Sequence, residues 1–131
     1  MFRRLRPTRR TAVAVLAAVV LLIAGFVYWF ATAPGEFRGP QCAPAARSCT
    51  EISGRVLYVQ ERDPDGDGDV HLVLLSHDSL TRRYISVVKL SRSERPEELP
   101  GFGRWVAATG RIYLGEGGER NLDVQRLVVD R

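Results

Sequence analysis

Four aspartates at alternate positions form the stretch of this sequence that is most suited to chemistry. The stretch reads "DPDGDGDVH" and contains Asp63, Asp65, Asp67 and Asp69, followed by His71. Carboxylate oxygens at alternate residues converge on a hard cation when a glycine lets the chain turn back. A glycine stands at the required sixth position of such a loop. The stretch therefore suggests either a calcium-binding loop or a hairpin turn that is acidic.

The calcium interpretation lacks its most important ligand. In an EF-hand-type loop counted from Asp63, the twelfth position needs a bidentate glutamate, and Leu74 occupies it. Asp123 or Glu119 would have to complete the site from elsewhere in the fold. In the other interpretation, the Asp-Gly pairs supply the positive φ angles of a hairpin. We favour the hairpin, keep weak calcium binding as the alternative, and expect no other cofactor.

An apolar segment precedes the part of the chain that holds this loop. The run from Ala12 to Ala31 carries no charge, and a helix of that length spans about 30 Å, the thickness of a bilayer core. We therefore expect residues 12–33 to form a transmembrane helix in contact with the lipid bilayer. The alternative is a signal peptide cleaved after Ala33. The length of the run and the aromatic residues 28–30, typical of a membrane interface, favour a retained helix.

The charges on either side of the apolar segment predict its orientation. Five arginines precede it, namely Arg3, Arg4, Arg6, Arg9 and Arg10. By the positive-inside rule, residues 1–11 form a cytoplasmic tail and the remainder of the chain is exported. All 15 acidic residues follow Pro34, and the part after Pro34 has a net charge of −1. The basic pI of the chain therefore gives no support for a nucleic-acid partner.

The compartment follows from this orientation and from the composition. Lys89 is the only lysine among 19 basic residues, a bias that suggests a GC-rich genome. We expect a single-pass protein of the bacterial plasma (inner) membrane with its C-terminal domain outside the cytoplasm. Residues 34–50 are rich in proline, glycine and alanine and predict a linker that holds this domain off the membrane. Cys42 and Cys49 are expected to form a structural disulfide that pins the linker to the start of the domain.

After Thr50 the sequence changes to short β-rich segments separated by turns. The predicted strands are residues 51–60, 70–76, 84–90, 104–114 and 121–129. Gly54 within the first strand indicates a bulge or a sharp bend. A short helical turn is expected from Ser93 to Leu99, between the third and fourth strands. Five strands with these features predict an all-β fold for residues 51–131, a small five-stranded OB-like Greek-key barrel. A simple open meander is the alternative.

Four segments carry a family resemblance. They are "GRVLYV", "GDVHLVLL", "LPGFGRWVAATGRIY" and "NLDVQRLVV". Together they resemble exported bacterial OB-fold modules, in which a Gly-Asp-x-His segment opens the second strand. The similarity covers residues 51–129, and it implies the fold without an established catalytic activity. A fold alone does not determine function.

The loops of such a barrel border the face that binds ligands. The ligand-face candidates are His71, Tyr84, Glu116 and Arg120. Four aspartates beside this face would repel phosphate, which argues further against nucleic acid. "DGD" before a strand is also similar to staphylococcal-nuclease-like enzymes, but no glutamate follows Arg82 and Arg83 in register. A nuclease is therefore the distant alternative. We expect a non-catalytic binding or interaction module with an envelope protein as its partner.

Overall fold

A long apolar helix lies near the N-terminus of the described chain. The computed structural model describes residues 8–33, 35, 37–61 and 66–130. Helix α1 comprises Arg9–Ala31, and its 23 residues span about 34 Å at 1.5 Å per residue. It is long and apolar enough to cross a membrane. The residue after the helix is its C-cap, Thr32, whose backbone N–H and hydroxyl both donate to the carbonyl of Tyr28, at 3.1 and 2.9 Å.

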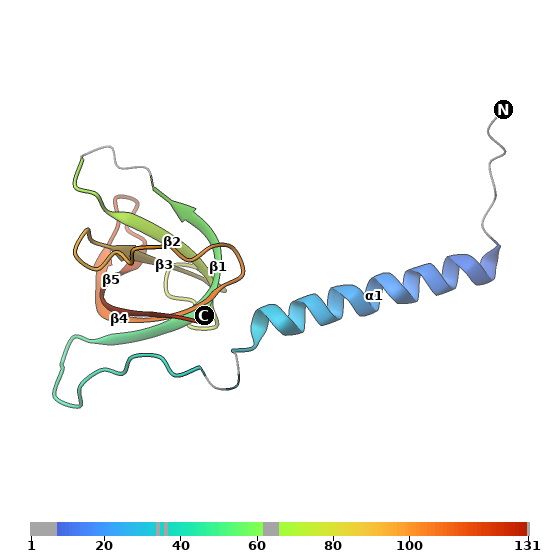
Figure 1. Ribbon diagram of the computed structural model, residues 1–131, viewed down its shortest axis with the longest axis horizontal. Helices are drawn as coiled ribbons and strands as arrows, with labels where there is room; N and C mark the ends of the chain where they lie inside the picture. The colour runs from blue at the N-terminus through green and yellow to red at the C-terminus, as the bar shows by residue number, and fades with distance from the viewer. Residues whose placement is uncertain (1–7, 34, 36, 62–65, 131) are drawn as a thin grey trace.

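The rest of the described chain is a closed five-stranded β-barrel (Figure 1). Its strands are β1 (Thr50–Gln60), β2 (Val70–Leu75), β3 (Ile85–Leu90), β4 (Trp105–Leu114) and β5 (Arg120–Val129). Their order around the barrel is β1-β2-β3-β5-β4. Only β3 and β5 pair in parallel; the other neighbours are antiparallel. The predicted OB-like barrel is therefore confirmed, and the open meander is wrong.

Strand β1 closes the barrel because it pairs with β4 along its first half and with β2 along its second. Arg55 takes part in both pairings, opposite Leu75 and Trp105. A side chain on the preceding residue, Gly54, would collide with the backbone carbonyl of Leu75. Glycine at this position therefore permits the close approach of β1 to the end of β2. The irregularity in register follows this glycine, between Val56 and Tyr58.

Alternating apolar side chains from all five strands fill the interior of the barrel. The fully buried large side chains include Val56, Leu72, Leu74, Val88, Leu90, Val106 and Leu122. They come from every strand, so no single hairpin has a core of its own. Barrel closure and core burial therefore depend on each other.

The segment between β3 and β4 differs from the expectation. Residues 91–104, all of which are described, contain turns and no helix. Two prolines explain the difference. Pro96 and Pro100 each disfavour the helical conformation in the residue before them, Arg95 and Leu99. Leu99 instead packs against the barrel core.

The linker contacts the barrel through its described residues, and its expected role of holding the domain off the membrane stays a prediction. Its described residues fold back along the barrel, where Gly39 contacts Ala107 of β4 so closely that a Cβ atom would lie 2.6 Å from the alanine side chain. The predicted disulfide between Cys42 and Cys49 is present. The backbone N–H of Cys42 donates to the Glu51 carboxylate at 2.7 Å, so the disulfide loop is fixed to the start of β1 as expected.

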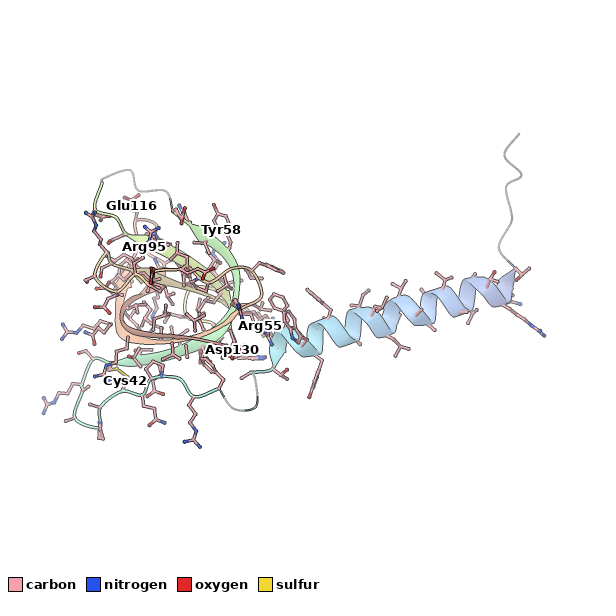
Figure 2. The ribbon with its side chains drawn as sticks, in the orientation of Figure 1. Cys42, Arg55, Tyr58, Arg95, Glu116 and Asp130 are labelled. Atoms are coloured by element: carbon pink, nitrogen blue, oxygen red, sulfur yellow. A yellow bond between two sulfur atoms is a disulfide. The ribbon has the colours of Figure 1, made fainter. Side chains whose placement is uncertain are left out.

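The barrel contacts the end of α1 directly, and Arg55 is the centre of this contact (Figure 2). Its guanidinium donates to the carbonyl oxygens of Trp29 at 2.8 Å, Thr32 at 3.2 Å and Gly103 at 2.7 Å. The guanidinium also lies 3.9 Å from the ring centroid of Trp29. Burial lowers the pKa of Arg55, while Asp130 raises it; an arginine nevertheless stays protonated at any physiological pH.

This contact satisfies the hydrogen-bonding needs of both the end of α1 and the guanidinium of Arg55. The last carbonyls of a helix lack intrahelical donors and favour a cation nearby. The buried guanidinium in turn needs acceptors, and it finds them on the helix end and on Gly103 of the barrel. Phe30, which is buried, adds an aromatic contact to Phe102 with ring centroids 5.5 Å apart. We define Arg55, Trp29, Thr32 and Gly103 as the helix–barrel junction.

Arg55→Ala should therefore destabilise the protein by more than a surface substitution would. Removing the guanidinium leaves three carbonyls without their donor, and each buried group left unsatisfied costs about 1–3 kcal/mol. Urea unfolding of the full-length protein in detergent micelles measures the loss. Arg126→Ala, on the exposed part of β5, is the control and should change stability by less than about 0.5 kcal/mol. Equal effects of the two substitutions would contradict the assigned role of Arg55.

Candidate functional site

The outer face of β2 and β3 carries the polar residues of the candidate site. Leu72 and Val88 point into the core, so their neighbours His71 and Lys89 point outward. These two residues are directly opposite each other in the antiparallel pairing. The sheet therefore presents an imidazole and an ammonium side by side, next to the end of the β1–β2 loop.

Lys89 is held between two carboxylates. Its Nζ atom lies 3.4 Å from Oδ2 of Asp69 and 3.9 Å from Oδ1 of Asp123. Asp69 comes from the end of the β1–β2 loop, and Asp123 is the partner of Lys89 in the parallel pairing of β3 with β5. The side chain of Asp69 is only 17 % exposed. Its contact with Lys89 is therefore screened less by water than an ordinary surface ion pair.

Tyr113 of β4 completes the group. Its ring centroid lies 5.1 Å from the Lys89 ammonium, and its hydroxyl lies 3.4 Å from Nε2 of His71. The five residues Asp69, His71, Lys89, Tyr113 and Asp123 are called the polar cluster below. They come from four strands and one loop, so only the closed barrel brings them together.

The electrostatics of the cluster follow from its partial burial. Burial acts to lower the pKa of Lys89, but the charge of Asp123 and the hydrogen bond and charge of Asp69 outweigh it, so the pKa is raised. Burial raises the pKa of Tyr113, against the opposing effects of Lys89 and Asn121. Lys89 is thus an ammonium and Tyr113 a neutral phenol throughout the neutral range.

This arrangement is suited to binding polar groups rather than phosphate. The single cation is already neutralised by two carboxylates, which leaves the cluster with one excess negative charge when His71 is neutral. Cationic side chains and hydrogen-bond donors are the groups that this field attracts. Nucleic acid, with its regular negative charge, is the polymer that it repels.

The described part of the acidic loop has the geometry of a turn. Oδ1 of Asp67 accepts a hydrogen bond from the backbone N–H of Asp69 at 2.9 Å. Gly66 and Gly68 adopt positive φ angles of 73° and 79°, as the hairpin interpretation requires. Asp63 and Asp65 of the proposed calcium loop lie outside the described residues.

Calcium binding by this loop stays a prediction. Among the residues that are described, no three His, Cys, Asp or Glu side chains are grouped to hold a metal ion. The structure does place Asp123, one of the two expected completing ligands, on the same side of the barrel as Asp69. The Lys89 ammonium lies between their carboxylates, at the position that a shared cation would take.

The other ligand-face candidates are not members of the polar cluster. Tyr84 precedes β3, at the end of the β2–β3 hairpin opposite to His71 and Lys89, and its ring contacts His77. Glu116 is exposed in the turn between β4 and β5, on the side of the barrel away from α1 (Figure 2). Arg120 opens β5 with an exposed side chain, and its carbonyl accepts a hydrogen bond from Thr81 at 2.7 Å.

Sequence reasoning named three members of the cluster: Asp69 and His71 as site candidates and Asp123 as a possible completing ligand. It missed Lys89 and Tyr113. A signal for Lys89 was present. It is a charged residue flanked by apolar residues that are buried on the other face of a strand, and such a position must point outward. The contact of Tyr113 with His71 had no comparable signal, because it depends on how the barrel closes.

The chain thus belongs to a structural class: an all-β, OB-like barrel of five strands preceded by an apolar helix of membrane-spanning length. No model of a known protein family matches it. No curated protein matches it at a significant level of similarity.

The polar cluster predicts a loss of stability at alkaline pH. The pKa of Lys89 is raised above the ordinary 10.5 and that of Tyr113 above 10.0, so the folded state retains both protons more firmly than the unfolded state. The contacts of Lys89 and Tyr113 should therefore contribute fully to the free energy of unfolding below about pH 10, and this contribution should fall as the pH rises further. Denaturant midpoints between pH 8 and pH 11 measure this. Lys89→Gln combined with Tyr113→Phe should flatten the decline, and an unchanged slope would contradict the assigned contacts.

Proposed function

We propose that the protein is a non-catalytic binding module anchored in the bacterial plasma membrane. In this proposal α1 crosses the bilayer once, the arginine-rich N-terminus is cytoplasmic, and the barrel is in the cell envelope outside the membrane. The barrel binds an envelope protein through the face that carries the polar cluster. The observation that carries the proposal is that Lys89, at the centre of this face, is already paired with two carboxylates.

Two features support a protein partner over a nucleic acid or a small anion. Lys89 is already paired with Asp69 and Asp123. The positive charge of this face is therefore compensated and would attract a phosphate only weakly. The outward residues next to it, Val73 and Val87, are apolar and only partly buried. An apolar patch beside charged and hydrogen-bonding groups is the usual composition of a protein–protein interface. The partner segment expected here carries lysine, arginine or backbone N–H groups toward the two carboxylates.

The direction of insertion is supported by the charge flanks and by the disulfide. Five arginines precede the apolar segment, and the structural disulfide follows it. Disulfides persist in oxidising compartments and are rare in the cytoplasm. Both observations favour the same orientation.

A cysteine-labelling experiment tests the orientation. Intact cells are treated with a mild reductant and then with a membrane-impermeant maleimide, and Cys42 and Cys49 should be labelled without permeabilisation. The control is Thr8→Cys in a background in which both native cysteines are serine. This cysteine should be labelled only after the membrane is opened. The reverse pattern would contradict the proposed topology.

Site-specific photocrosslinking tests the binding face. A benzophenone amino acid replaces Val87, two residues before Lys89 and on the same face, and the full-length protein is irradiated in native membranes. We expect one dominant protein adduct, which Asp123→Lys should reduce because it reverses a negative charge that would attract the cationic groups of the partner. The matched control replaces Arg126, an exposed residue of β5 that pairs with β4. Equal adducts at both positions, or none at Val87, would argue against this face.

A further inference from the structure

A groove lies between the last two turns of α1 and the adjacent end of the barrel. Its volume is about 350 Å³. Phe26, Phe30 and other residues of the helix form one wall; Leu57, Leu75, Tyr84 and Phe102 contribute to the barrel wall. The walls are almost entirely apolar. Such a cleft is unusual on the surface of a small soluble protein and marks a site of interaction.

We propose that this groove is a lipid site and that it takes an acyl chain of a phospholipid from the leaflet in which α1 ends. The inference deepens the proposed function and rests on it, because it requires α1 to cross the membrane. The first argument is continuity. Phe26 and Val27 line the groove, yet both are more than half exposed on the same helix face that would contact lipid. A lipid packed against the helix at this level therefore already contacts the groove.

The depth of the groove is fixed by the helix. Phe26 precedes Ala31, the last residue of α1, by five residues, which places it about 7.5 Å deeper along the helix axis. The groove therefore covers the part of the span where the acyl chains begin below the headgroups. The helix–barrel junction holds the barrel at this level, because Arg55 bonds to carbonyls of both α1 and Gly103.

The rim of the groove has the composition of a membrane interface. Phe102 is 67 % exposed and Tyr84 is 48 % exposed. Aromatic side chains of this kind collect at the level of lipid headgroups. Arg82 and Arg83 directly precede Tyr84 and are exposed, with the Arg83 guanidinium 5.3 Å from the Tyr84 ring centroid. Arginines at this position are suited to headgroup phosphates, while the acyl chain enters between the aromatic rings.

The backbone of the barrel wall also supports a ligand. Tyr84 adopts φ of 62°, a conformation that is costly for a bulky residue, and hydrogen bonds with Ser79 and Ser76 hold it there. Strain of this kind concentrates at binding sites.

The experiment uses photoactivatable lipid. The full-length protein is reconstituted into vesicles of phosphatidylethanolamine and phosphatidylglycerol that contain a phosphatidylcholine with a diazirine in its acyl chain. After irradiation, adducts are mapped by mass spectrometry. We expect adducts on α1 and, in addition, on residues 75–84 and 102–105 of the barrel. Ala31→Phe places a ring in the groove and should reduce the barrel adducts several-fold relative to those on α1. Ala17→Phe, on an exposed part of the helix, should leave the ratio unchanged.

The outcomes separate this inference from the anchoring proposal. Adducts confined to α1 in protein that floats with the vesicles would overturn the lipid site and leave the anchor intact. Loss of flotation together with loss of α1 adducts would overturn both. Crosslinked dimers that disappear in Ala31→Phe would assign the groove to a second copy of the chain. If Ala31→Phe disturbs the helix end, Phe102→Ser removes the opposite wall and should give the same decrease; unchanged barrel adducts in that variant would also overturn the site.

Discussion

The buried guanidinium of Arg55 is the interaction on which the arrangement of this protein depends. A helix that ends beside a barrel leaves carbonyl groups without donors, and a charged side chain beneath it must not be left without acceptors. Arg55 solves both problems because its five N–H groups reach two carbonyls of the helix end and one of the barrel. Lysine cannot replace it, since a single ammonium does not match three acceptors placed around a plane.

Because this junction holds α1 against one end of the barrel, the two ends of the β2–β3 hairpin lie in different environments. Leu75 and Tyr84, at one end, border the apolar groove beside α1. His71 and Lys89, at the other end, belong to the polar cluster. Four residues of extended strand separate His71 from Leu75, about 13 Å at 3.3 Å per residue. If α1 crosses a membrane as proposed, the end of the hairpin beside α1 therefore lies nearer the lipid than the end that carries the polar cluster.

The sequence predicted the helix, the strands and the disulfide better than it predicted the contacts between distant segments. The apolar run, the five strands and the disulfide followed from length, periodicity and spacing, because these are local properties of the chain. No signal in the sequence indicated the contacts between distant segments. The packing of Gly39 on Ala107 and the hydrogen bonds of Arg55 to the helix end are such contacts. The role of the linker as a spacer from the membrane stays a prediction. The expected helical turn ignored what two prolines do to the residues before them.

The polar cluster shows the same limit for the candidate site. The run of aspartates attracted attention because it is unusual in sequence, yet its last member, Asp69, is already matched by Lys89. That lysine was noted only for its rarity, because nothing in the linear sequence places it beside Asp123 and Tyr113. Barrel closure makes these contacts, through the parallel pairing of β3 with β5 and the reach of β4. The face consequently presents a compensated group of charges rather than an open set of carboxylates. Such a face discriminates between partners by the geometry of their donors more than by total charge.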